Sequence, residues 1–158
     1  MQRTLTVIHA LGLLLVVFSA AYLLPIVTAV IYADYTILLD FLVAMVWTLS
    51  IGFLMWLLTR RHKGELSIRH GYLLVVAMWT AMPMFATLPL LLAIPDLSFT
   101  DAYFETMSGL TTTGATVLTG LDNMPPAINV WRHELNWVGG LGIIVLAVAV
   151  LPLLGIGG

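Results

Sequence analysis

The sequence predicts an all-α membrane protein with four transmembrane helices, plus a short helix and an extended loop that enter the bilayer without crossing it. Of its 158 residues, 61% are hydrophobic and only 9% are charged, whereas an average soluble domain is about 25% charged. Four apolar stretches of roughly 20 residues or more each match a helix that crosses a ~30 Å hydrocarbon core. A polar run of small residues separates the third stretch from the fourth.

The first two spans form the leading part of the chain, residues 1–65. The first is expected from Leu5 to Tyr32, with a kink near Pro25, because proline lacks the amide donor that a helix needs. We interpret it as a retained helix rather than a signal peptide, since its apolar run exceeds the usual core of about 7–15 residues. The second span is expected from Thr36 to Leu58, and a strongly basic loop, Thr59–Glu65, follows it.

The second part of the chain, residues 66–158, has the pattern of a helix–pore loop–helix repeat. A third span covers about Gly71–Ile94 and a last span about Ala127–Leu154, in which Pro152 predicts a kink. The region Pro95–Pro126 between them contains a short helix that is too polar and too brief to span a bilayer. Its backbone can lie at membrane depth only where protein or a water-filled cavity surrounds it.

Charged residues predict the orientation, because cytoplasmic loops of membrane proteins are enriched in Lys and Arg. Placing the basic loop in the cytoplasm puts the N-terminus there too, with five of the six Lys and Arg residues, and leaves Arg132 outside. The pore loop then enters from the external face, where seven of the eight acids predict a vestibule that attracts cations. The alternative is that Asp34, Asp96 and Asp122 merely cap helices or solvate loops. The seven acids are Asp34, Asp40, Asp96, Asp101, Glu105, Asp122 and Glu134.

The short helix is expected over Ser98–Gly109. Ser98 is a favourable N-cap, and Asp101 three positions later imitates a capping box with a shorter acid. Asp101 and Glu105 also favour the positive end of the helix dipole. If the helix dips inward from outside, its carbonyl end points toward the membrane centre, where partial negative charge favours a cation. Three aromatic residues are expected to pack against the surrounding spans: Phe99, Tyr103 and Phe104.

The run Thr111–Thr116 has the composition of an ion-selectivity filter, with Thr111 deepest and Thr116 outermost. A filter needs carbonyl oxygens that face one axis, and Gly114 permits the positive φ that such a backbone requires. Threonine hydroxyls can supply further oxygen ligands or hold the loop from behind. The run contains no carboxylate, which favours uncharged oxygens suited to a large monovalent ion. The alternative is an external threonine-rich loop without this role.

The chain resembles the Trk-type potassium uptake subunits, a superfamily of potassium transporters, in the N-terminal portion that contains the first pore-loop repeat. The resemblance extends from Leu11 to Gly158. It implies two leading helices followed by helix–pore loop–helix repeats, with one filter glycine in each repeat. The segments that carry it are Arg60–Leu66, Asp101–Glu105, Thr111–Thr116 and Trp137–Leu146.

The resemblance implies uptake of potassium into the cell with selection against sodium. It also implies that main-chain carbonyls of the loop bind the ion: those of Thr113 and Gly114 first, then those of Thr112 and Ala115, with Thr111 and Thr116 flanking them. Potassium is then the transported ligand, and no covalent cofactor is expected. Channel-like flux and symport with a proton or sodium are both left open.

The resemblance further implies the partners and the location. Family members lie in the bacterial inner (plasma) membrane as multi-pass proteins, and they work as homodimers with a cytoplasmic nucleotide-binding regulatory subunit. They carry four pore-loop repeats in one chain, and a closed pore needs all four. This sequence has one such repeat, so we expect a fragment whose remaining three repeats complete the pore. The alternative is a non-conducting or assembling membrane subunit.

Other classes of function find no support in the residues. A net charge of −2 does not favour nucleic acid as a partner, and without cysteine there are no thiolate metal sites. No fingerprint for ATP, NAD or a hydrolytic nucleophile occurs, so we expect no enzyme. Two structural expectations concern the last span. Close helix packing is favoured over a gating hinge at Gly139, Gly140 and Gly142, and Arg132 and Glu134 are expected to pair with each other or with acids of the short helix.

Overall fold

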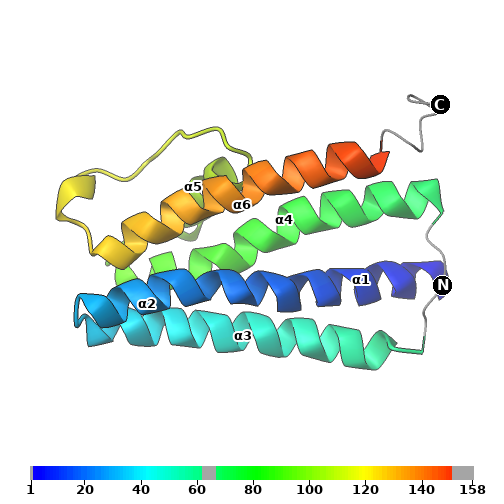
Figure 1. Ribbon diagram of the computed structural model, residues 1–158, viewed down its shortest axis with the longest axis horizontal. Helices are drawn as coiled ribbons and strands as arrows, with labels where there is room; N and C mark the ends of the chain where they lie inside the picture. The colour runs from blue at the N-terminus through cyan, green and yellow to red at the C-terminus, as the bar shows by residue number, and fades with distance from the viewer. Residues whose placement is uncertain (1, 62–66, 151–158) are drawn as a thin grey trace.

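The computed structural model describes residues 2–61 and 67–150, and within these ranges the chain is helical, without strands. Figure 1 shows the long helices side by side along one axis, so the all-α prediction is confirmed. Three described segments are long and apolar enough to cross a membrane: Thr4–Ile31, Tyr35–Thr59 and Arg69–Ala93. The elements in chain order are α1 (Gln2–Phe18), the 3-10 turn η1 (Ser19–Tyr22), α2 (Leu23–Ile31), α3 (Tyr35–Thr59), α4 (Ile68–Ala93), α5 (Phe99–Leu110), the 3-10 turn η2 (Leu121–Asn123) and α6 (Pro126–Val150).

The first predicted span, Leu5–Tyr32, is a helix that changes its winding just before Pro25. It is α-helical in α1, tightens into η1 and becomes α-helical again in α2. Pro25 has no amide hydrogen, so the carbonyl of Ala21 loses its helical donor. The 3-10 turn lies directly before the helix that contains Pro25, and the kink expected near Pro25 stays a prediction.

Two glycines bring α1 and α3 into backbone contact. A Cβ atom on Gly12 would lie 2.8 Å from the Gly52 carbonyl oxygen, and one on Gly52 would lie 2.9 Å from the Gly12 carbonyl oxygen. Side chains at these positions would therefore separate the helices. At the start of α3, Asp34 Oδ1 accepts a hydrogen bond from the Ile37 amide at 3.2 Å. The capping alternative for Asp34 is thus confirmed.

The core is built around Trp131 of α6, which is fully buried. Its ring stacks on Tyr22 with centroids 4.6 Å apart, and the rings of Phe18 and Phe41 pack around it at 6.1 and 5.8 Å. Its Nε1 donates a hydrogen bond to the Ala86 carbonyl at 3.1 Å. Residues of α1, η1, α3, α4 and α6 therefore meet in one cluster, and the two predicted parts of the chain share a core.

A second polar contact in this core compensates for a proline. Pro89 of α4 cannot donate to the carbonyl of Phe85 four residues earlier. The Tyr22 hydroxyl, from the leading part of the chain, donates to that carbonyl at 3.0 Å and lies 3.1 Å from Thr48 Oγ1. The break that Pro89 makes in the hydrogen-bond ladder of α4 is thus closed by a side chain from another helix.

Side chains of α5 donate to carbonyl groups of α4 and so fix the short helix. Thr106 Oγ1 donates to the Pro83 carbonyl at 2.8 Å, and the Tyr103 hydroxyl donates to the Thr80 carbonyl at 3.2 Å. At the start of α5, Ser98 Oγ accepts from the Asp101 amide at 3.1 Å and donates to Asp101 Oδ2 at 2.8 Å. The predicted N-cap is confirmed, whereas the Asp101 carboxylate accepts from the Ser98 hydroxyl and not from the Ser98 amide that a capping box uses.

The predicted packing of two aromatic residues on α5 is wrong. Phe99 is 54% exposed and Phe104 is 45% exposed, and Phe99 stacks on Tyr103 rather than on a neighbouring helix. The buried side of α5 carries small and polar residues instead, among them Ala102 and Thr106. These residues permit α5 to approach α4 and α6 closely enough for hydrogen bonds, which a face of large rings would prevent.

The chain reverses direction after α5. Figure 1 shows α5 ending near the middle of the bundle, after which the chain returns to the end where α2 meets α3 and where η2 lies. α6 starts from this end and runs back along α5. A Cβ atom on Gly139 would overlap the carbonyl group of Leu110, which confirms the predicted close packing at that glycine.

α6 is not among the three segments that meet the length and hydropathy criteria for a membrane span within the described residues. Its first half carries Arg132, His133, Glu134 and Asn136, and its apolar part continues to Val150. A fourth span therefore stays a prediction. The kink expected at Pro152 lies outside the described residues.

Candidate functional site

The end of α5 is closed by a Schellman motif, and this motif sets the start of the loop. The Thr112 amide donates to the Gly109 carbonyl and the Thr113 amide to the Ser108 carbonyl, both at 2.9 Å. These two bonds define the motif, in which the residue directly after the C-cap has a left-handed backbone. That residue is Thr112, with φ of +58°. A β-branched residue is disfavoured in this region, and such strain concentrates at functional sites.

Gly114 has a φ of +77°, and a Cβ atom placed on it would meet nothing within 4 Å. The positive φ predicted for this glycine is confirmed. The absence of a close neighbour means that backbone conformation, and not lack of space, calls for glycine here.

The carbonyl groups of the loop fall into two classes. Those of Thr112, Thr113 and Gly114 belong to exposed residues and accept no hydrogen bond from the described part of the chain. The carbonyl of Ala115 accepts one from Ser108 Oγ at 2.6 Å. Three of the four predicted ligand residues thus present carbonyl oxygens without a partner, and the fourth is tied to α5.

Threonine hydroxyls hold the inner part of the loop from behind, as the sequence suggests. Thr111 Oγ1 donates to the Met107 carbonyl at 2.7 Å and lies 2.8 Å from Thr113 Oγ1. Both hydroxyls therefore form hydrogen bonds close to the end of α5, and the arrangement does not single out either of them as an ion ligand.

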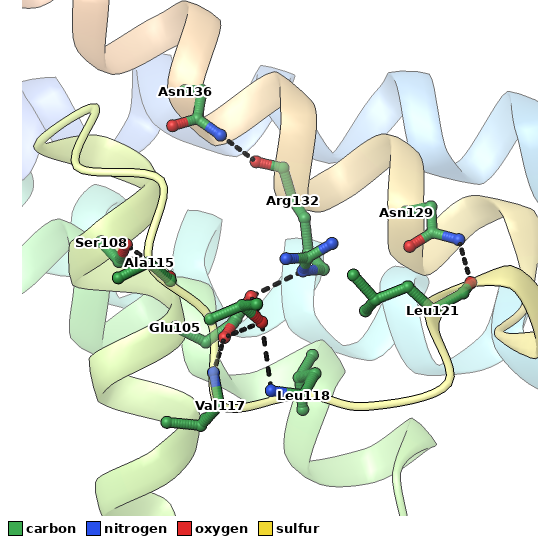
Figure 2. A network of polar contacts seen from close by, with 10 residues as sticks. Glu105, Ser108, Ala115, Val117, Leu118, Leu121, Asn129, Arg132 and Asn136 are labelled. Atoms are coloured by element: carbon green, nitrogen blue, oxygen red, sulfur yellow. Dashed lines mark hydrogen bonds and ion pairs between the residues drawn. The ribbon is translucent and has the colours of Figure 1, made fainter.

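The outer part of the loop is anchored by Glu105 of α5 (Figure 2). The Thr116 hydroxyl lies 2.9 Å from both carboxylate oxygens of Glu105, and the Val117 amide donates to Oε2 at 3.1 Å. Thr116 Oγ1 also accepts from the Leu118 amide at 3.1 Å. The flanking residue Thr116 therefore joins the loop to the middle of α5.

Arg132 of α6 completes this network. Its Nε donates to Glu105 Oε1 at 2.6 Å, with the two side chains only 14% and 4% exposed. Of the two alternatives for Arg132, pairing with an acid of the short helix is confirmed. Glu134 does not share in it, and its Oε2 is buried without a hydrogen-bond partner among the described residues.

The sequence reading of Glu105 was wrong in one respect. It placed this acid in an external vestibule, whereas the side chain is buried and neutralised by Arg132. The spacing in α5 carries a signal for this, because Glu105 shares a helix face with Ala102 and Gly109, both buried. Asp101 and Asp122 differ from it: Asp101 is half-buried in the first turn of α5, and Asp122 is exposed in η2.

A further contact and a cavity complete the site. Asn129 Nδ2 of α6 donates to the Leu121 carbonyl at 2.8 Å, which ties the far end of the loop to the same helix (Figure 2). A cavity of about 200 Å³ lies between α5, the loop and α6. Its walls include Glu105, Ser108, Gly114, Arg132 and Asn136. The cavity lies beside Gly114, whose amide donates to the Ser108 carbonyl at 3.4 Å.

This arrangement can offer uncharged oxygens to a cation. Among the described residues no group of three or more His, Cys, Asp or Glu side chains could hold a metal ion. The loop itself presents unpaired carbonyl oxygens without any carboxylate, and oxygens of this kind replace the hydration shell of a monovalent ion in selectivity filters. One loop supplies such oxygens from one side only, so a complete cage needs further loops.

Known transport proteins of one family are similar to this chain. Residues 37–158 match the TrkH family, described as cation transport proteins. The Trk system potassium uptake protein TrkH of Salmonella typhimurium strain LT2 is 50% identical over 151 residues, which are 93% of this chain and 30% of that protein. The Trk system potassium uptake protein TrkG of Escherichia coli K12 is 40% identical over 153 residues, which are 96% of this chain and 31% of that protein.

A solved structure shows the same fold. The crystal structure of the potassium transporter TrkH from Vibrio parahaemolyticus matches with a TM-score of 0.90 and 47% identity, over 98% of this chain and 33% of that one. The chain thus spans about a third of the length of the relatives that it matches. Since the family match covers well over half of the residues, the chain belongs to the TrkH family of cation transport proteins.

Proposed function

We propose that this chain supplies one quarter of a potassium-selective pore that takes potassium into the cell. The observation that carries the proposal is the set of unpaired carbonyls at Thr112, Thr113 and Gly114, which follow the end of a short capped helix. The carbonyl end of α5 adds the negative end of its dipole at the same place. Both features favour a dehydrated cation.

In this proposal the main-chain carbonyls of Thr113 and Gly114 are the first potassium ligands, and Thr112 is the next. Ala115 contributes less, because its carbonyl already accepts a hydrogen bond from Ser108. Thr111 and Thr116 flank the filter and hold it. Selection against sodium follows from weak-field carbonyl oxygens, which suit the larger ion.

The proposed topology has four transmembrane helices, with α5 as a re-entrant pore helix between the third and the fourth. Residues 1–65 form two leading helices and residues 66–158 the first pore-loop repeat. The N-terminus lies in the cytoplasm and the loop opens outward, as the distribution of Lys and Arg favours. The reversal of the chain after α5 in Figure 1 supports this arrangement. The membrane is the bacterial inner membrane.

The proposed partners rest on the length of the relatives and on the family resemblance. Since this chain covers 30% of the Salmonella protein, we expect three further repeats of the full-length protein to supply the other sides of the pore. A homodimer and a cytoplasmic nucleotide-binding regulatory subunit complete the proposed assembly. The 158 residues alone are expected not to conduct, because a lone loop would leave its carbonyls without an enclosing cage.

The test compares two glycines of the same loop in the full-length protein. Gly114 and Gly120 have φ values of +77° and +67°, and a Cβ atom on either meets nothing within 4 Å. Serine at either position therefore brings similar backbone strain, about 1–2 kcal/mol, without a clash. Only Gly114 lies in the proposed filter.

Uptake of rubidium and of sodium is measured in cells that lack other potassium uptake. We expect Gly114→Ser to lower the rubidium-to-sodium ratio and Gly120→Ser to leave it close to that of the unaltered protein, at equal membrane levels. An unchanged ratio in Gly114→Ser would refute the filter assignment. Rubidium uptake by the 158-residue chain alone would refute the proposal that further repeats are needed.

A further inference from the structure

We propose that Glu105 and Arg132 are positioning residues that set the ion selectivity of the loop by holding its outer end against α6. The inference rests on the proposed function, since selectivity has meaning only if the loop conducts. It concerns a contact between α5, the loop and α6 that lies outside the carbonyl run itself. Neither side chain touches the ion in this proposal, and both act through the backbone of the loop.

The first step is the acceptor role of Glu105. Its two carboxylate oxygens together receive the Thr116 hydroxyl, the Val117 amide and Arg132 Nε, all within 2.6–3.1 Å. A carboxylate accepts on both oxygens, and charge-assisted hydrogen bonds are about twice as strong as neutral ones. The backbone directly after the filter run is therefore fixed relative to α5.

The second step is the dependence of Glu105 on Arg132. The Glu105 side chain is 4% exposed, and a buried carboxylate without a counter-charge would take up a proton or turn toward water. Either change removes acceptors from Thr116 and Val117. Because Arg132 belongs to α6, the orientation of the carboxylate, and through it the outer end of the loop, is set by that helix.

The third step is the contrast between the two ends of the loop. The inner end is held by α5 through the Schellman motif, and Ser108 of the same helix also binds the Gly114 amide at 3.4 Å and the Ala115 carbonyl at 2.6 Å. Between the two ends, a Cβ atom on Gly114 meets nothing within 4 Å, and a cavity of about 200 Å³ lies behind the loop. The direction of the unpaired carbonyls therefore depends on these backbone contacts with Ser108 and on where the outer end is fixed.

The first experiment removes one contact from the exposed side of the network in the full-length protein. Thr116→Val deletes the hydroxyl that donates to Glu105 and accepts from Leu118 and keeps the shape of the side chain. Thr119→Val is the matched control, since Thr119 is exposed in the same loop and makes no hydrogen bond with the described residues. We expect the rubidium-to-sodium uptake ratio to fall about tenfold in Thr116→Val, as for the loss of a charge-assisted hydrogen bond, and to stay within about twofold in the control.

The second experiment distinguishes the effect of the Glu105–Arg132 ion pair from the effect of the hydrogen bonds that Glu105 accepts from the loop. Glu105→Gln leaves one acceptor oxygen for contacts that now use two, so selectivity falls. Exchanging the charges, with Glu105→Arg and Arg132→Glu together, restores an ion pair but places a donor-only side chain opposite the Val117 amide. We expect the exchange to raise the amount of protein in the membrane above that of either single variant, while selectivity stays low. Asp101→Asn, on the same helix, is the control and leaves selectivity unchanged.

The outcomes separate this proposal from the one on which it rests. If Gly114→Ser lowers the ratio and both Thr116→Val and Glu105→Gln leave it unchanged, the positioning role is overturned and the filter assignment stands. Full selectivity in the charge-exchanged protein would also overturn it, since pairing alone would then suffice. If the exchanged protein does not reach the membrane, Thr116→Val decides, because it leaves the buried pair intact.

Discussion

Replacing Tyr22 with Phe removes a hydroxyl that compensates for a proline in a neighbouring helix. The hydroxyl donates to the Phe85 carbonyl at 3.0 Å and lies 3.1 Å from Thr48 Oγ1. Because Pro89 has no amide hydrogen, the carbonyl of Phe85 has no helical donor to fall back on. A buried polar group left unpaired costs about 1–3 kcal/mol.

The physical reason can be tested by restoring the missing donor. In Pro89→Ala the amide of residue 89 can donate to the Phe85 carbonyl, as in an uninterrupted helix. We therefore expect Tyr22→Phe to cost about 1–2 kcal/mol less in the Pro89→Ala background than in the unaltered protein. The remaining loss reports the contact with Thr48, and Thr48→Val measures it separately.

The assay is thermal unfolding of the four members of this double-mutant cycle, which include the unaltered full-length protein, purified in one detergent. Tyr72→Phe on α4 is the control, because Tyr72 is 57% exposed, and we expect it to change stability by less than about 0.5 kcal/mol. An equal loss of stability from Tyr22→Phe in both backgrounds would refute the reasoning, since the hydroxyl would then not substitute for the amide that Pro89 lacks.

Two further predictions concern α6 and the orientation of the chain. Gly139→Ala is expected to destabilise the protein and displace the end of α5, because its Cβ would overlap the Leu110 carbonyl. The Cβ of Gly142→Ala would meet nothing within 4 Å, and this variant is expected to gain up to about 1 kcal/mol of stability from helix propensity. Thermal unfolding compares the two variants, and equal melting temperatures would contradict the close approach of Gly139 to Leu110. Because the chain contains no cysteine, single cysteines at Asp122 and Arg61, both exposed, can report sidedness in a cysteine-free full-length background. A membrane-impermeant maleimide is expected to label residue 122 in intact cells and residue 61 only after permeabilisation, and the reverse pattern would invert the proposed topology.

The sequence was sufficient where the signal is local. The caps at Asp34 and Ser98 lie within three residues of the groups they bind. The positive φ of Gly114 follows from the same local logic. Each of these features depends on backbone geometry over one turn, which residue type alone can predict.

The sequence was insufficient where the partner lies far along the chain. Tyr22 and Phe85 are 63 residues apart, and no local pattern indicates that they meet. The pairing of Arg132 with an acid of the short helix was one of two predicted alternatives, but the sequence did not identify Glu105, 27 residues away, as that acid. The strained Thr112 was missed for a different reason. Helices commonly end with glycine or asparagine in the left-handed position, and threonine at that place gives no signal in the sequence.

The pairing of Glu105 with Arg132 also bears on where attraction for the cation comes from. Glu105 and Arg132, whose nearest atoms lie 2.6 Å apart, together carry no net charge, so the pair adds no net negative charge beside the loop. The attraction next to the unpaired carbonyls is then due to peptide dipoles and to the carbonyl end of α5. Dipoles in fixed positions distinguish ions by size through the number and direction of oxygens, so the geometry of the loop matters more than net charge. A buried pair without net charge that fixes the loop is consistent with that requirement.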